Sequence, residues 1–388
     1  MWRAGESETG LTAMIHKRYY ETTAVCNDRK ENMETEIIRV NREDLTPEDL
    51  KKAANIIRKG GLVAFPTETV YGLGGDAFDP TASKRIYAAK GRPSDNPLIV
   101  HIADLSEITR VACDIPDAAY ALAGKFWPGP LTMILKKRDE LPRETTGGLD
   151  TVAVRMPSDP VAALLIREAG VPIAAPSANL SGRPSTTCAD HVIEDLSGRI
   201  DMIIDSGASK IGLESTIVDL TCEPALILRP GFITKEMLSE VIPDVGFDKA
   251  VSGRPGDEKA PPKAPGMKYR HYAPKGELVI YSGTRSDVTE KIKEETEIEL
   301  AKGSRVGILV CDEEADVLKK LFDERVTIKT LGSRDNEEEI ASVLFARLRE
   351  FDDEGSEKIF SQALSNGGLG SAIMNRMMKA AGYHIEQV

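Results

Sequence analysis

The sequence predicts an α/β protein of two domains, a larger one built on a mixed sheet and a smaller C-terminal one built on a parallel sheet. The chain has 388 residues, more than one ordinary domain takes. Short apolar strands recur between helical stretches over residues 36–245, but without the regular alternation of a doubly wound fold. After residue 276 strands and helices alternate regularly, which favours a small Rossmann-like sheet of parallel strands.

The first domain is expected to span residues 36–245, after a polar and aperiodic N-terminal tail, residues 1–35, that we expect to be flexible. Its first strand is expected at 36–40. Thr46, Pro47 and Asp49 predict a helix start, because they supply an N-cap hydroxyl, a proline at the first helical position and an acid in the first turn. That helix should end at Gly60. Further strands are expected at 62–65, 98–102, 131–135, 151–155, 171–175, 202–204, 216–220 and 225–228, and a last helix at 234–241.

A linker is expected at residues 246–275, because Gly, Pro and charged residues dominate there. Residues 249–275 hold seven basic and two acidic residues, whereas residues 276–388 hold 15 basic and 23 acidic ones. This change of charge marks a boundary and suggests that the basic linker meets an anion. The domain after it, residues 276–388, should hold strands at 278–281, 305–310, 326–330 and 358–361, each followed by a helix.

Composition excludes several classes of protein. No stretch approaches the roughly 18 apolar residues of a membrane-spanning helix, and the N-terminus has no apolar signal core, so we expect a cytoplasmic protein with no membrane contact. The five cysteines form no CxxC pair and the five histidines no metal-binding spacing, so no protein metal site is expected. The net charge of −12 argues against binding nucleic acid by overall charge.

Four segments rich in Gly, Pro and polar residues flank the apolar strands and helices of the first domain. They are residues 66–75 (PTETVYGLGG), 90–97 (KGRPSDNP), 176–184 (PSANLSGRP) and 212–216 (GLEST). Because α/β proteins place ligands in loops at strand ends, we expect these segments to form a binding site.

The segment at 90–97 is the most specific of the four. Lys84, Arg85, Lys90 and Arg92 place four cations within nine residues that contain no acid. In an extended chain Lys90 and Arg92 would point to one side and reach one anion, with the planar fork of Arg suited to phosphate oxygens. This pattern predicts triphosphate binding, with a solvated basic loop as the alternative.

Other polar residues extend the expected site. Ser177, Asn179 and Ser181 could bind phosphate or ribose oxygens, or they could cap a turn. Arg155 and Arg229 each end an apolar strand, which suggests a cationic cleft for a carboxylate and phosphates. No Ser-His-Asp or Cys-His arrangement is evident, which fits in-line attack on phosphorus, where positioning and charge stabilisation do the catalysis.

Seven motifs occur in an order that resembles the YrdC-like threonylcarbamoyl-AMP synthases. They are PTETVYGLG, KGRPSDNPL, FWPGPLT, VAVRMP, PSANLSG, ESTIVD and LRPG, within residues 36–242. PGMKYRHYAP at 265–274 and GLGSAIMNRMMKAA at 368–381 resemble the long, two-domain form of the family. The resemblance implies a twisted open mixed sheet around a cationic cavity. It also implies a reaction in which the amine of L-threonine takes up bicarbonate or CO2 as a carbamate that attacks the α-phosphate of ATP.

The resemblance also implies roles for residues at matching positions. Lys90 and Arg92 would be the catalytic cations. The nucleotide contacts would be Arg92, Asn96, Thr151, Ser177, Ser185, Arg229 and Tyr272. Asn179, suggested by the segment at 176–184, is expected to be a further nucleotide contact. The L-threonine contacts would be Thr69, His101, Arg155, Ala175 and Ser215. The linker, with Tyr269 and Tyr272, would fold over the cavity and exclude water.

The family implies Mg²⁺ bound with ATP and a partner enzyme that transfers the product to an adenosine of tRNA, so a tRNA or double-stranded RNA contact is also expected. Three alternatives stay open at this point. The chain could be a double-stranded RNA-binding module, or a carbamoyltransferase that forms carbamoyl-adenylate. The C-terminal domain could be only a structural partner of the first.

Overall fold

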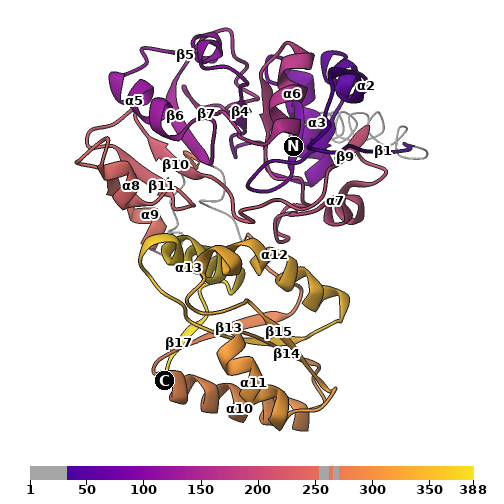
Figure 1. Ribbon diagram of the computed structural model, residues 1–388, viewed down its shortest axis with the longest axis vertical. Coiled ribbons are helices and arrows are strands. Elements are labelled where there is room, and N and C mark those ends of the chain that lie inside the picture. Colours follow the sequence, from indigo (N-terminus) through magenta and orange to yellow (C-terminus); the bar gives the residue numbers. More distant parts are fainter. Residues whose placement is uncertain (1–32, 253–261, 265–270) are drawn as a thin grey trace, which may run out of the picture.

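The computed structural model describes residues 33–252, 262–264 and 271–388 (Figure 1). Most of the expected tail, residues 1–32, and the linker residues 253–261 and 265–270 lie outside the described residues, and Tyr269 is among them.

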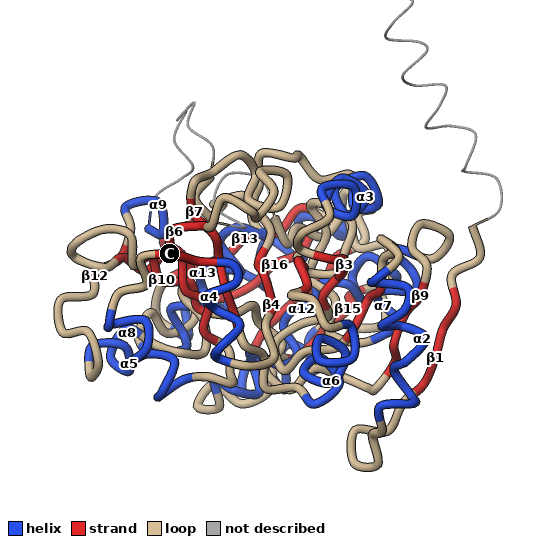
Figure 2. Tube along the Cα trace, turned by 90° about the horizontal axis from the view of Figure 1, so that it is seen from above, coloured by secondary structure: helices blue, strands red, loops and turns tan. Residues whose placement is uncertain are grey.

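The first sheet has twelve strands and is mixed, as the sequence predicts. Its order is β1-β9-β2-β3-β8-β4-β7-β6-β10-β11-β12, with β5 paired to β6. Figure 2 shows β1 and β12 at opposite sides of the molecule, in keeping with their places at the two ends of this order. The strands are β1 (Glu36–Arg39), β2 (Val63–Phe65), β3 (Gly72–Asp76), β4 (Ile99–His101), β5 (Ala112–Cys113), β6 (Leu131–Lys137), β7 (Thr151–Arg155), β8 (Ile173–Ala175), β9 (Met202–Asp205), β10 (Thr216–Asp219), β11 (Leu226–Arg229) and β12 (Gly246–Phe247).

Successive residues of the buried strands enter two different apolar cores, because side chains alternate between the faces of a sheet. In β2, Val63 and Phe65 pack with α2 (Pro47–Arg58) and α6 (Pro160–Ala169), whereas Ala64 packs on the opposite side. The opposite core includes residues of α3 (Pro80–Lys90), α5 (Asp117–Phe126) and α7 (Ala189–Leu196). The strands are therefore apolar on both faces, which explains why they read as continuous apolar runs.

The predicted start of the first helix is confirmed. The carboxylate of Asp49 accepts hydrogen bonds from the backbone N–H and the hydroxyl of Thr46, both at 2.8 Å, and Pro47 is the first residue of α2. These bonds fix the first turn at the site of the otherwise unpaired N-terminal amides.

Strand β3 was not predicted from the sequence. The segment 66–75 was expected to be a glycine-rich loop, but its second half belongs to β3. A Cβ atom added at Gly74 would lie 2.6 Å from a side-chain atom of Ile173 and 2.7 Å from one of Phe65. Glycine is therefore needed for close packing inside the sheet, and its presence hid the strand. The short strands β5, β12 and β17 (Ile385–Gln387) were not expected either.

The second sheet has five strands that are all parallel, in the order β15-β14-β16-β13-β17, which confirms the predicted parallel domain. Its other strands are β13 (Glu277–Ser282), β14 (Val306–Val310), β15 (Val326–Thr330) and β16 (Lys358–Gln362). Figure 1 shows α10 (Arg285–Ala301) and α11 (Asp312–Leu321) far from the first domain, and α12 (Glu337–Asp353) and α13 (Gly368–Ala380) next to it. The remaining short helices are α4 (Ile108–Val111), α8 (Lys235–Ser239) and α9 (Lys249–Ser252), with a 3₁₀ turn at Leu105–Glu107.

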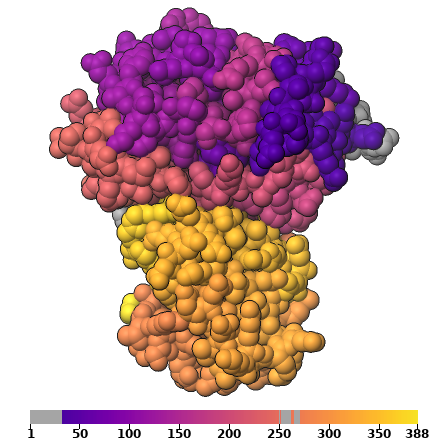
Figure 3. All heavy atoms as spheres, viewed as in Figure 1, coloured from indigo at the N-terminus to yellow at the C-terminus, as the bar shows by residue number. Residues whose placement is uncertain are grey.

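Two arginines of the second domain pair with carboxylates of the first. Figure 3 shows that the two lobes adjoin. Arg349 of α12 binds the carboxylate of Asp195 at 2.8 Å and the carbonyl of Pro184 at 2.7 Å. Arg376 of α13 binds Glu214 at 2.8 Å. Both arginines are almost fully buried, at 1% and 0% exposure. The domains thus share buried charges as well as apolar contacts.

Candidate active site

The four predicted loop segments converge on one cavity, together with residues of the linker. We call it the central cavity; its empty space, including the open mouth, is about 590 Å³. Its lining includes ten of the predicted site residues: Thr69, Arg92, His101, Ala175, Arg155, Ser177, Asn179, Ser215, Arg229 and Tyr272. The residues from the predicted loops and strand ends therefore meet at one place.

Strand register brings three polar side chains of the cavity region together. In the ladder, His101 of β4 pairs with Arg155 of β7, and Arg155 pairs with Thr132 of β6. Residues in register across neighbouring strands point to the same face of a sheet. The hydroxyl of Thr132 lies 2.8 Å from the hydroxyl of Ser215, which extends this polar row into the segment before β10.

Arg155 is a buried cation held from one side by the loop that follows β2. Its Nη1 donates to the hydroxyl of Thr69 at 2.9 Å, and its Nη2 lies 2.7 Å from the carboxylate of Glu68. Thr69 in turn contacts the hydroxyl of Thr67 at 2.8 Å. Within the described residues neither Nε nor Nη2 of Arg155 makes a hydrogen bond, and Nη2 is held by the ion pair with Glu68 alone. A buried guanidinium with an open donor beside a cavity is suited to a carboxylate.

His101 is neutral at physiological pH. Burial, helped by the charge of Arg155, lowers the pKa of His101 to about 3. Its Nδ1 lies 3.1 Å from the carbonyl of Ile99, so Nδ1 carries the proton and donates there. A neutral imidazole with this tautomer leaves Nε2 as a hydrogen-bond acceptor.

A second buried cation, Arg229, ends β11, three strands from β7 in the same sheet, and also lines the cavity. Its Nε donates to the carbonyl of Ser215 at 2.9 Å and its Nη2 to the hydroxyl at 3.1 Å. Burial lowers the pKa of Arg229 to about 10, so it remains charged at neutral pH. Arg92, Arg155 and Arg229 together make the cavity cationic, as the sequence predicted.

The expected geometry of Lys90 and Arg92 was wrong. Lys90 is the last residue of α3 and is not part of an extended KxR, and Gly91 follows it in a left-handed conformation with φ of 64°. The ammonium of Lys90 is buried and donates to the carbonyls of Ser177 and Asn179, the latter at 2.6 Å. Lys90 thus holds the loop at 176–184 and does not line the cavity, whereas Arg92 does.

Three other predicted residues also lie outside the cavity lining. Asn96 is buried, and its backbone carbonyl accepts from Arg92 at 3.3 Å. Ser185 donates to Glu214 at 2.5 Å. Thr151 begins β7 and so lies at the opposite end of this strand from Arg155, roughly 13 Å away at about 3.3 Å per residue.

The linker residues that the structure describes close one side of the cavity. His271 and Tyr272 are buried and line it. The ring of Tyr272 stacks on Phe345 of α12 with centroids 5.1 Å apart, and the guanidinium of Arg376 lies 5.9 Å from its centre. Tyr272 has a φ of 66°, which is unusual for a residue other than glycine and shows how firmly its surroundings hold it.

Five residues in or next to the central cavity were not predicted as site residues from the sequence: Thr67, Glu68, Glu214, His271 and Arg376. Burial favours the neutral form of Glu214, but Arg376 and Arg229 outweigh it and lower the pKa of Glu214 to about 2. Glu214 lies within the ESTIVD motif, so its position there was a usable signal. Arg376 likewise lies within the GLGSAIMNRMMKAA motif, but nothing in the sequence shows that Glu214 is its partner.

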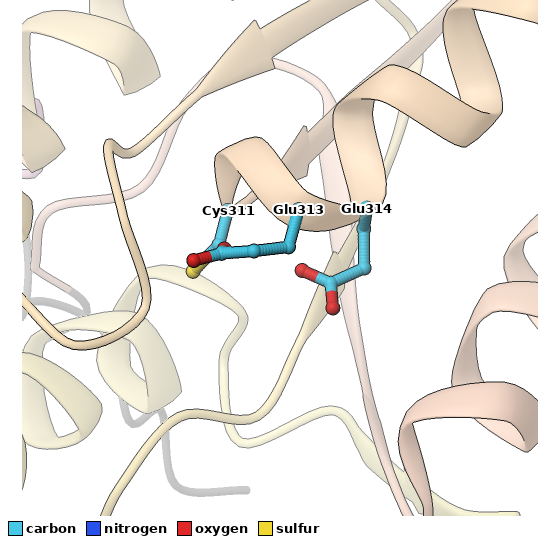
Figure 4. A group of neighbouring side chains, drawn as sticks. All are labelled: Cys311, Glu313 and Glu314. Carbon is cyan, nitrogen blue, oxygen red and sulfur yellow. The ribbon is translucent and has the colours of Figure 1, made fainter.

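One group of possible metal ligands exists in the described part of the chain, and it lies outside the cavity. Figure 4 shows Cys311, Glu313 and Glu314 at the start of α11. Glu314 pairs with Arg285 and Arg334 at 2.5 and 3.0 Å, and Glu313 accepts from the hydroxyl of Ser333 at 3.0 Å. Burial raises the pKa of the Cys311 thiol to about 11. Protein donors therefore already engage both carboxylates.

The buried histidines predict acid destabilisation that begins near pH 6.5. Burial lowers the pKa of His101 and His271 to about 3, so the unfolded chain binds their protons more tightly than the folded one. Above pH 6.5 these histidines do not lower the free energy of unfolding. As the pH falls below 6.5, the free energy of unfolding decreases by up to about 1.4 kcal/mol per histidine per pH unit. We expect the free energy of unfolding, measured with urea at several pH values between 6.5 and 5, to fall at this rate.

The variant His101→Gln should lower the slope of the free energy of unfolding against pH, because up to one proton fewer is taken up on unfolding. This holds whatever the effect of the variant on stability at pH 7. The matched control is His384→Gln, which changes an exposed histidine and should leave the slope as it is. Equal slopes for wild type and His101→Gln would contradict the assignment.

No helix among the described residues is long and apolar enough to cross a membrane. A protein-family model described as "Telomere recombination" matches residues 55–231. A second one, described as "Threonylcarbamoyl-AMP synthase, C-terminal domain", matches residues 233–382.

Full-length relatives match both parts of the chain. The threonylcarbamoyl-AMP synthase of Pyrococcus abyssi is 48% identical over 348 residues, which cover 89% of this chain and 98% of the relative. That of Bacillus subtilis is 47% identical, over 86% of this chain and 93% of the relative. The crystal structure of P. abyssi Sua5 complexed with L-threonine superposes with a TM-score of 0.85 at 47% identity, over 91% of this chain and 100% of that one. With sequence and fold matched along both domains, the chain belongs to the threonylcarbamoyl-AMP synthase family, in its two-domain form.

Proposed function

We propose that the chain condenses L-threonine, bicarbonate and ATP into threonylcarbamoyl-AMP and pyrophosphate. The observation that carries this proposal is the pair of buried arginines, Arg155 and Arg229, that end two strands of one sheet and line one cavity. One cation can take the carboxylate of an amino acid while the other takes phosphate oxygens. The solved relative complexed with L-threonine supports the choice of amino acid.

In the proposed reaction, the amine of L-threonine and bicarbonate give a carbamate and water. A carbamate oxygen then attacks the α-phosphorus of ATP, and pyrophosphate leaves with the electron pair of the broken P–O bond. Arg155 would bind the threonine carboxylate, next to Thr69 and the acceptor nitrogen of His101. Ala175, through its backbone, and Ser215 would complete the threonine site.

The nucleotide would lie toward Arg92 and Arg229, whose positive charges stabilise the charge that develops on the phosphates. The further nucleotide contacts we propose are Asn96, Thr151, Ser177, Asn179, Ser185 and Tyr272. Lys90 would act as a positioning residue that holds the 176–184 loop through its carbonyls. His271 and Tyr272 would keep water from the labile carbamate and adenylate.

Magnesium would enter as part of the MgATP substrate, held by phosphate oxygens. Among the described residues, Glu214 is the one carboxylate that lines the central cavity, and Arg376 and Ser185 already bind it. We further propose that residues 36–245, 246–275 and 276–388 act as catalytic domain, linker and second domain, and that the enzyme works in the cytoplasm. A downstream enzyme would transfer the threonylcarbamoyl group to tRNA.

The test is pyrophosphate release from ATP and bicarbonate, with and without L-threonine, with nucleotide products separated by chromatography. We expect release that depends on threonine, together with a new adenylate. Release that requires carbamoyl phosphate would favour a carbamoyltransferase. Salt-sensitive RNA binding without turnover would favour an RNA-binding module, and either result would overturn the proposal.

A further inference from the structure

We propose that Glu68 is a positioning residue for amino-acid recognition, which orients the guanidinium of Arg155 so that it receives the carboxylate of the substrate. The inference rests on the proposed function, because that function assigns the substrate carboxylate to Arg155. Glu68 does not line the central cavity, so it would act only through Arg155.

Two contacts from one loop fix the orientation of Arg155. Adjacent residues of one loop engage different nitrogens, Glu68 at Nη2 and Thr69 at Nη1, at 2.7 and 2.9 Å. Two anchors on separate nitrogens define the plane of a guanidinium, which a single contact does not. In the described part of the chain Nε has neither a hydrogen bond nor an ion pair, and Nη2 is held by the ion pair with Glu68 alone.

The loop that carries Glu68 is itself held in place. The backbone N–H of Ile211 donates to the carbonyl of Glu68 at 2.8 Å, and the hydroxyl of Thr67 donates to the carbonyl of Val70 at 2.6 Å. The carboxylate of Glu68 is therefore presented to Arg155 from a fixed backbone. Glu68 is 7% exposed and Arg155 4%, so water competes little with the pair.

Glu68 also serves as the counterion of Arg155. Burial opposes its ionisation, but the Arg155 guanidinium outweighs burial and lowers the pKa of Glu68, so the pair is ionised at neutral pH. A buried cation that lacks a counterion is costly. Glu68 compensates Arg155 before the substrate arrives, while neutral His101 adds no further charge.

The experiment compares binding of L-threonine with binding of L-threoninamide, which lacks the carboxylate, by calorimetry without ATP. Wild type should prefer L-threonine. Glu68→Ala should reduce this preference at least tenfold, because Arg155 loses one anchor, while KM for ATP changes less than twofold. Glu68→Gln should recover only part of the preference, since it keeps the size of the side chain but removes the charge that pairs with Nη2.

The matched control is Glu314→Ala, a buried carboxylate of the second domain that pairs with two arginines. It should lower the melting temperature but leave the preference unchanged. If Glu68→Ala does not fold, Glu68→Asp replaces it; it keeps the charge but withdraws it by one methylene, and should also lose preference. A preference that is kept or strengthened in the variant overturns the inference. Absence of threonine-dependent turnover in wild type would instead refute the proposed function.

Discussion

Replacing Arg155 with alanine is expected to lower kcat/KM for L-threonine by about 100- to 1,000-fold. A buried, hydrogen-bonded charge pair that loses one partner costs about 2–5 kcal/mol, and the loss would fall on the carboxylate of the substrate. Arg155 ends β7 in register with His101, so the change removes the cation from the cavity and also leaves Glu68 without its ion-pair partner. Steady-state pyrophosphate release at varied threonine measures it.

The control for this variant is Arg143→Ala, which removes an exposed arginine paired with Asp150 at 2.9 Å and should leave the kinetics unchanged. Arg155→Lys should fall between wild type and alanine, because one ammonium cannot reproduce the fork that serves Thr69, Glu68 and a ligand. A threonine KM within twofold of wild type in Arg155→Ala would contradict the assignment.

Replacing Arg376 with methionine is expected to destabilise the protein by about 3–5 kcal/mol and to abolish most turnover. The substitution leaves the buried carboxylate of Glu214 without its strongest partner, and a broken buried pair costs about that much. It also frees the carbonyl of Pro230, which accepts from Arg376 at 2.8 Å, and removes the cation beside the Tyr272 ring. Chemical unfolding and pyrophosphate release are the two measurements.

The double variant Glu214→Gln with Arg376→Met should regain most of the stability, because no unpaired charge remains, yet stay poorly active. Arg325→Ala is the surface control, since Arg325 is an exposed arginine of the second domain that pairs with Asp323 at 2.8 Å, and exposed pairs contribute little to stability. Near-normal turnover in Arg376→Met would mean that the second domain supports the first only structurally.

Much of the fold was readable from the sequence because its signals are local. The capping of α2 by Thr46 and Asp49, and the β-α alternation after residue 276, depend on residues close together in the chain. The strand β3 was missed for a tertiary reason. Its glycines are required by the packing of Phe65 and Ile173, and a glycine-rich sequence alone favours a loop.

The site shows the same division. Arg155, Arg229 and His101 were predictable because each ends a strand, and strand ends meet at the edge of a sheet. The geometry of Lys90 was not, because its helix continues to Lys90 itself and turns the ammonium toward backbone carbonyls. The contact of Arg376 with Glu214 could not be predicted, although Arg376 lies in the motif at 368–381, since the two residues are 162 positions apart and belong to different domains.

The row formed by His101, Arg155 and Thr132 makes the length of the strands as important as their composition. Side chains alternate along β7, so inserting or deleting one residue within Thr151–Arg155 would turn Arg155 to the opposite face and present an apolar side chain to the cavity. The loops around the cavity can change length at modest cost. A change of length in the central strands is therefore expected to disrupt the site, whereas a change of length in the surrounding loops is expected to be tolerated.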